Sequence, residues 1–180
     1  MTDDRSVFQL MSELIAEQGI SCVLIGGFAV NFHKVSRQTG DIDFLITEED
    51  FAKISGILEK SGYEKVSGGD TFVHFKSKRL PLMNMDFMFI DKDVIKKMMG
   101  EGEKLKIGRY KFTVVSLNHL IALKLHSIKH NFKLRFTKDF PDIINLIRVN
   151  GVNIKDKSFK ELCLKYGTQE IYKKIEEFAK

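Results

Sequence analysis

The chain has 180 residues, with 43% hydrophobic and 29% charged side chains and a formal net charge of +5. These are ordinary values for a soluble globular protein, so we expect one domain, or one domain with a small helical extension. No stretch reaches the ~18 apolar residues of a membrane helix, and the first residues do not resemble a signal peptide. Cys22 and Cys163 have no metal-binding or redox spacing, which favours the cytoplasm.

The hydrophobic pattern up to residue 115 alternates between helical and strand periodicity. Within it, Thr47 and Asp50 are spaced as a capping box that begins a helix ending near Gly62. Gly108 and Arg109 form a two-residue hairpin turn between two strands. The remaining predicted helices are 6–18, 28–34 and 91–99, and the predicted strands are 22–25, 42–46, 63–66, 71–76, 83–90, 104–107 and 110–115.

From residue 116 the periodicity becomes helical, with expected helices at about 117–129, 140–149, 155–166 and 169–178. We therefore predict an α/β (α+β) fold. Residues 1–115 would form a mixed β-sheet core flanked by helices, and residues 116–180 a helical C-terminal subdomain packed on that core.

Two aspartates stand two positions apart at the start of a predicted strand. Side chains at i and i+2 of a strand point to the same face, so Asp41 and Asp43 lie side by side and repel each other unless a cation lies between them. Mg²⁺ is the natural candidate, because it takes oxygen ligands and is held by carboxylates together with substrate phosphates. Asp86 stands between apolar neighbours in a later strand, where an unpaired carboxylate is costly. Three such acids suit a metal-assisted phosphoryl or nucleotidyl transfer.

Gly26 and Gly27 follow the strand at 22–25. Glycine permits close backbone approach, and a turn that leads into a helix directs amide groups toward a phosphate. These glycines lie where one strand ends, and the acids lie where the next begins. The two strands must therefore run antiparallel if glycines and acids are to face one site.

Further candidates lie in the helical third. Lys124 falls on an apolar stripe of its predicted helix, where a lysine needs an anionic partner unless it reaches the edge of that face. Arg135 and Lys138 are candidates for phosphate or acceptor contact. For Asp139 and Asp142 we favour the N-cap and N3 positions of a helix that has Pro141 in its first turn.

The histidines receive no functional assignment from the sequence. His126 and His130 are four residues apart on one predicted helix, a spacing compatible with zinc, but no Cys, His or Glu cluster completes a site. His33, His74 and His119 are isolated.

Together these motifs resemble the nucleotidyltransferase superfamily with the polymerase-β-like palm. More narrowly, IGGFAVNFHKVSRQTGDIDF, LIALKLHSIKH and RFTKDFPDIINLI resemble small bacterial nucleotidyltransferase-like proteins related to abortive-infection and toxin–antitoxin components. The resemblance covers about residues 23–147. It implies that Asp41, Asp43 and Asp86 bind metal and that Asp86 activates the acceptor hydroxyl. It also implies nucleotide binding by Gly26, Gly27, Arg37, Thr39, Lys124 and Lys138. For Arg37 the sequence leaves two alternatives, a contact with phosphate or a pair with an acid.

We therefore predict a metal-dependent nucleotidyltransferase. With Mg²⁺ or Mn²⁺ it would transfer a nucleoside monophosphate from a triphosphate such as ATP to a hydroxyl of RNA, protein or a small molecule. Many active members of the resembled superfamily have Ser or Thr where this chain has Phe28. The alternative is thus a catalytically weak or inactive nucleotide-binding or toxin–antitoxin module with the same fold. A sugar-nucleotide glycosyltransferase also uses Asp-x-Asp, but the paired glycines and the chain length disfavour it.

Overall fold

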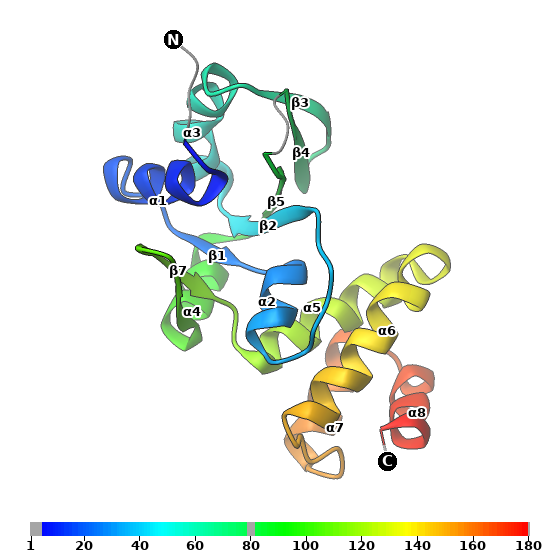
Figure 1. The fold of residues 1–180 in the computed structure, drawn as a ribbon. Helices are drawn as coiled ribbons and strands as arrows, with labels where there is room; N and C mark the ends of the chain where they lie inside the picture. Colours follow the sequence, from blue (N-terminus) through cyan, green and yellow to red (C-terminus); the bar gives the residue numbers. More distant parts are fainter. Residues whose placement is uncertain (1–4, 79–81, 180) are drawn as a thin grey trace. The chain divides into compact units, whose positions relative to one another are not determined.

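The computed structural model describes residues 5–78 and 82–179. Strands and helices are mixed up to residue 114, and helices alone follow from there on (Figure 1). The strands are β1 (Cys22–Leu24), β2 (Asp41–Ile46), β3 (Tyr63–Gly68), β4 (Phe72–Ser77), β5 (Asn84–Phe89), β6 (Glu103–Ile107) and β7 (Tyr110–Val114). The helices are α1 (Val7–Glu17), α2 (Gly26–Phe32), α3 (Glu48–Lys60), α4 (Lys92–Glu101), α5 (Leu117–His130), α6 (Phe132–Val149), α7 (Lys157–Tyr166) and α8 (Gln169–Phe178).

One mixed sheet joins the strands in the order β3-β4-β5-β2-β1-β7-β6. The β2–β5 and β1–β7 pairs are parallel, and the other neighbouring pairs are antiparallel. The predicted α/β class with a mixed sheet is confirmed. The hairpin at Gly108 is also found, because Ile107 pairs with Tyr110 across it.

The chain divides into two compact units. The sheet unit comprises the described residues up to 29 together with 38–116, and the helical unit comprises 30–37 together with the described residues from 117. The short segment 30–37 thus belongs with helices that follow it by some eighty residues in the sequence. The predicted docking of residues 116–180 on the core stays a prediction.

The sheet unit is built around large apolar side chains from its central strands. Phe44 on β2 and Phe87 on β5 are fully buried, with their rings stacked 5.7 Å apart. Thr47 caps α3 as predicted, because its hydroxyl accepts from the Asp50 amide. The Asp50 carboxylate, however, accepts from the backbone amide of Ser21 at 2.9 Å and binds Lys53. Asp50 therefore ties the residue before β1 to α3.

One prediction for the helical unit is wrong. We placed a helix start at Asp139, but α6 begins at Phe132, and Pro141 lies inside the helix. Asp139 is therefore an interior residue and not an N-cap, and Asp142 is not an N3 residue. Phe132, Phe136 and Phe140 follow at intervals of four and stack at 4.6 and 4.7 Å, which continues the helix N-terminal to the proline.

Both cysteines are free and buried. Burial raises the pKa of the Cys22 and Cys163 thiols to about 12, so neither is a ready nucleophile. Among the described residues, no helix combines the length and the apolar character that a membrane crossing requires.

Candidate active site

The glycine pair and the first two acids meet because β1 and β2 run antiparallel, as the sequence predicted. Leu24 pairs with Phe44, and one residue further on the Ile25 amide donates to the Asp43 carbonyl at 2.9 Å. The end of β1 therefore lies beside the start of β2. The glycines that open α2 are thus brought next to the aspartates.

The third acid arrives through the parallel pairing of β2 with β5, in which Asp43 stands opposite Asp86. Asp41 and Asp43 share a face because they are two residues apart, and directly paired residues also share a face. One carboxylate oxygen from each of the three lies within 4.8 Å of the others. We call Asp41, Asp43 and Asp86 the acid triad. The sequence predicted that these three come together, and they do.

The acid triad fits a hard divalent cation. Each of its members is half-buried and offers a carboxylate oxygen. With bonds of ~2.0–2.1 Å, the ligands of one octahedral Mg²⁺ lie roughly 3–4 Å apart, so oxygens within 4.8 Å of one another can reach one ion after small side-chain movements. Within residues 5–78 and 82–179, this is the only group of three or more His, Cys, Asp or Glu side chains with metal-binding spacing.

The two glycines make room for the acid triad and its neighbours. Gly26 has φ +63°, and a Cβ atom there would lie 1.9 Å from Asp43 Oδ2. A Cβ atom on Gly27 would lie 2.6 Å from the Thr39 hydroxyl oxygen. Any larger residue would displace these side chains. The glycines are therefore required by the packing of the site itself, a reason that the sequence did not reveal.

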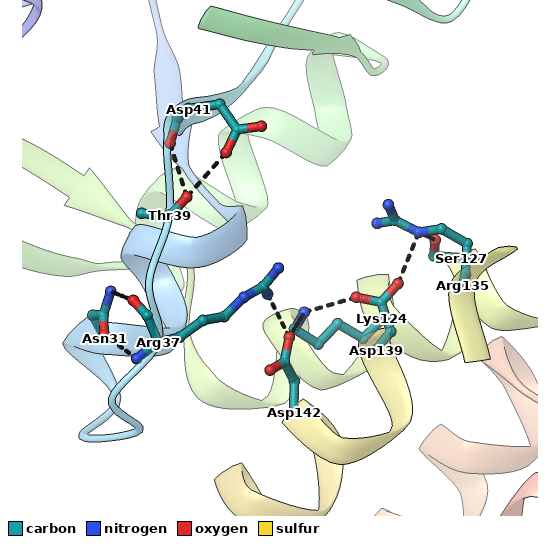
Figure 2. Close-up of polar contacts among 9 residues, drawn as sticks. All are labelled: Asn31, Arg37, Thr39, Asp41, Lys124, Ser127, Arg135, Asp139 and Asp142. Carbon is teal, nitrogen blue, oxygen red and sulfur yellow. Dashed lines mark hydrogen bonds and ion pairs between the residues drawn. The ribbon is translucent and has the colours of Figure 1, made fainter. Parts of the chain in front are cut away.

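Thr39 holds Asp41. Its hydroxyl lies 3.0 Å from Asp41 Oδ1 and 3.1 Å from the Asp41 carbonyl oxygen (Figure 2). A hydroxyl donor beside a carboxylate restricts the rotation of that carboxylate. The contact gives Thr39 a place at the site, while the nucleotide contact suggested by the resemblance stays a prediction.

Sequence reasoning missed His74. The antiparallel β4–β5 pairing places His74 opposite Asp86, and its Nδ1 bonds to Asp86 Oδ1. Only the strand register could have revealed this, because the segment between the two residues includes positions outside the described part of the chain. The next row along the same face holds Phe72 and Met88, which are 46% and 43% exposed, so this side of the site is open to solvent.

Phe28, which replaces the hydroxyl residue of many superfamily members, packs inside the sheet unit. Its ring meets that of Phe8 on α1 edge-on at 5.3 Å, and Phe8 in turn packs against Phe112 at 6.0 Å. The ring thus belongs to an aromatic cluster between α1, α2 and β7. This packing accounts for an apolar residue directly after the glycines.

The helical unit holds a second group of charges, which we call the charged cluster. Lys124 on α5 is only 6% exposed, and its Nζ lies 2.9 Å from Asp139 Oδ1 and 2.7 Å from Asp142 Oδ2 on α6 (Figure 2). Arg37 also donates to Asp142, and Arg135 forms an ion pair with Asp139 at 2.8 Å. The anionic partner predicted for Lys124 is thus supplied by two aspartates of the chain. The cluster contains three cations for two carboxylates.

Arg37 is held in place from its backbone outward. Asn31 accepts from the Arg37 amide at 2.7 Å and donates to its carbonyl at 2.8 Å (Figure 2). This clamp fixes the Arg37 backbone, and the guanidinium separately donates to Asp142. Lys138, the remaining predicted nucleotide-binding residue, is exposed on α6.

The histidine pair on α5 has its rings 4.2 Å apart. In the described part of the chain, no third His, Cys, Asp or Glu joins them as a metal group. Both histidines are exposed on α5.

Known proteins resemble the chain both in sequence family and in fold. A family model described as an uncharacterised nucleotidyltransferase matches residues 6–180. The fold is similar to that of the antibiotic-resistance factor ANT(2'')-Ia, with a TM-score of 0.62 and 14% identity over 94% of this chain and 95% of that one. It is also similar to the lincosamide antibiotic adenylyltransferase LnuA, with a TM-score of 0.55 and 16% identity over 77% and 93% of the two chains. A putative nucleotidyltransferase from Thermotoga maritima, TM1012, gives 0.52 and 16% over 73% and 89%.

At such identities the structural similarity shows the fold alone. No curated protein sequence matches the chain.

Proposed function

Since the chain belongs to this family of nucleotidyltransferases, we propose that it transfers a nucleoside monophosphate from a nucleoside triphosphate to an acceptor hydroxyl. The observation that carries the proposal is the acid triad, whose carboxylate oxygens lie within 4.8 Å of one another beside a glycine turn. In such a transfer the acceptor oxygen bonds to the α-phosphorus, and the bond from that phosphorus to the bridging oxygen breaks. Pyrophosphate leaves, and the hydroxyl proton must go to a base.

We assign the acid triad to metal binding and Asp86 also to acceptance of that proton. Asp41, Asp43 and Asp86 would hold Mg²⁺ or Mn²⁺, which supplies charge neutralisation at the phosphates when bound. Asp86 suits the base because it lies on β5, next to the open face that carries Phe72 and Met88. An acceptor can approach from that face without crossing the acids on β2.

The remaining predicted residues would bind the triphosphate. Gly26 and Gly27 open α2 beside Asp43, where their backbone amides are candidates for phosphate contact, and Thr39 lies against the same turn. For Arg37 and Lys124 the proposal rests on charge, since the three cations of the charged cluster exceed its two carboxylates by one. Lys138 is exposed and available to a phosphate.

The acceptor class is open to three candidates: a small molecule, RNA or a protein. ANT(2'')-Ia has been determined with adenylyl-2''-tobramycin, and the lincosamide antibiotic adenylyltransferase LnuA with lincomycin. By analogy of fold, a small-molecule hydroxyl is the first acceptor class to screen.

The test is incubation of the protein with labelled triphosphates, Mg²⁺ or Mn²⁺ and a panel of small-molecule hydroxyl acceptors, with pyrophosphate release as the readout. We expect release by the native protein and its loss in Asp43→Asn. Asp70→Asn, at an exposed position in the β3–β4 turn, is the matched control and should keep full activity. Release that survives Asp43→Asn would overturn the assignment.

A weak or inactive nucleotide-binding module is the second candidate, favoured by Phe28. Its ring occupies the position after the glycines, where many superfamily members carry a hydroxyl. Calorimetry with ATP and Mg²⁺ separates the two: binding without pyrophosphate release, in the presence of an acceptor screen, supports the module.

A further inference from the structure

His74, Asp86 and Asp43 form one row across three strands. Asp43 pairs with Asp86 through the parallel β2–β5 ladder, and Asp86 pairs with His74 through the antiparallel β4–β5 ladder. Directly paired residues project to the same face of a sheet. The imidazole therefore extends the acid triad by one strand, and its Nδ1 bonds to Asp86 Oδ1.

A carboxylate has two oxygens, and the two outer members of the acid triad each have one oxygen engaged by a side chain of the protein. Thr39 engages Asp41 Oδ1 at 3.0 Å, and His74 engages Asp86 Oδ1. The second oxygen of each carboxylate remains for a metal ion, and a carboxylate has about four lone-pair sites, so Asp86 keeps one for the acceptor proton. Side chains that bond to metal ligands fix the orientation of those ligands, and their loss typically lowers metal affinity or activity by about 10- to 100-fold.

We propose that His74 is a positioning residue for Asp86. Its Nδ1–H donates to Asp86 Oδ1 and holds the carboxylate so that its other oxygen points toward Asp41 and Asp43. The inference rests on the proposed function, because it assigns His74 to the same metal-binding triad.

A purely structural role for His74 is a poor explanation of this contact. The His74 and Asp86 side chains are 30% and 32% exposed. The neighbouring β4 residues Val73 and Phe75 point to the opposite face and are buried, so they provide the packing of the strand. Replacement of His74 should therefore leave the fold intact.

The test uses three substitutions of His74 that differ in whether, and where, they place a hydrogen-bond donor. His74→Asn places an amide nitrogen close to the position of Nδ1, His74→Gln places one near Nε2, and His74→Leu has no donor. Binding of Mn²⁺ to the protein is measured by the EPR signal of the free ion, with pyrophosphate release from ATP as the second readout. Phe72→Leu, on the same face of β4, is the matched control.

We expect His74→Leu and His74→Gln to lose about 10- to 100-fold in Mn²⁺ affinity, and His74→Asn to recover most of that loss. The urea midpoints of the three His74 variants should match that of the native protein. The Mn²⁺ affinity of Phe72→Leu should also match the native value. Native affinity in His74→Leu would overturn the proposal, and so would a His74→Asn protein as weak as His74→Leu.

If the proposed function itself is wrong, the Mn²⁺-binding measurements give a different result. In that case the native protein itself does not bind Mn²⁺, or Asp43→Asn binds it equally well. Tight Mn²⁺ binding by the native protein and by His74→Leu, with loss in Asp43→Asn, would reject the role of His74 alone.

Discussion

The protein gathers aspartates in two places, and the two groups differ in what the carboxylates face. In the acid triad of the sheet unit, three carboxylates converge on one another, and each is half-buried. In the charged cluster of the helical unit, two carboxylates converge on the ammonium group of Lys124 (Figure 2). Asp139 and Asp142 are only 0% and 8% exposed, and arginines complete their surroundings.

The comparison separates two uses of the same side chain. Like charges held together reduce stability, and proteins keep them where function requires it. Opposite charges that are buried together stabilise each other. Removal of one partner leaves the other as an unpaired charge in the protein interior, which is strongly destabilising. Loss of one charge should therefore lower the free energy of unfolding in the charged cluster and raise it in the acid triad.

The largest effect is expected in the charged cluster. Lys124→Met keeps the length of the side chain but leaves Asp139, which is fully buried, without its ammonium partner. We expect the free energy of unfolding to fall by about 3–5 kcal/mol, the usual result of breaking a buried ion pair. Urea unfolding followed by circular dichroism measures it.

Lys129→Met is the matched control, because Lys129 lies on the same helix and is exposed. Its change should stay within about 0.5 kcal/mol, as for most surface positions. Similar losses in the two variants would show that the charged cluster has no special energetic role.

A second effect tests the close approach of the glycine turn to the acid triad. Gly26→Ala introduces a side chain at φ +63° and a Cβ atom 1.9 Å from Asp43 Oδ2. Gly19→Ala has φ +58° with no atom within 4 Å of the added Cβ, so it carries the backbone penalty alone. We expect Gly19→Ala to cost about 1–2 kcal/mol and Gly26→Ala to cost more.

The two variants also differ in metal binding. Gly26→Ala should weaken Mn²⁺ binding because Asp43 must move, whereas Gly19→Ala should bind like the native protein. Equal Mn²⁺ affinity in both would mean that the position of Asp43 is not what the glycine protects.

The sequence predicted the acid triad well because the evidence for it is local. The two-residue spacing of Asp41 and Asp43 puts them on one face, and an aspartate between apolar neighbours marks Asp86. The antiparallel pairing followed from the requirement that one site includes both the glycines and the acids. It was confirmed by the Leu24–Phe44 register.

The features that were missed depend on the tertiary structure. The bond from His74 to Asp86 requires the register of β4 on β5, which hydrophobic alternation leaves open. Pro141 suggested a helix start, yet α6 continues through it, and Asp139 points to Lys124 on α5. Propensity at one residue was overruled by packing and by an ion pair between helices.

The smallest expected effect is a gain in stability. Asp43→Asn removes one of three like charges and keeps the shape of the side chain, and Asp43 stands directly opposite Asp86. With chelator present, we expect the free energy of unfolding to rise by about 0.5 kcal/mol, because like charges at directly paired positions of a sheet are destabilising. Added Mg²⁺ should stabilise the native protein, since an ion that binds only the folded state shifts the unfolding equilibrium, and should not stabilise the variant. Urea midpoints in chelator and in Mg²⁺, with Asp70→Asn as control, measure both. A loss of stability in chelator would mean that the triad, like the charged cluster, holds its aspartates for structural reasons.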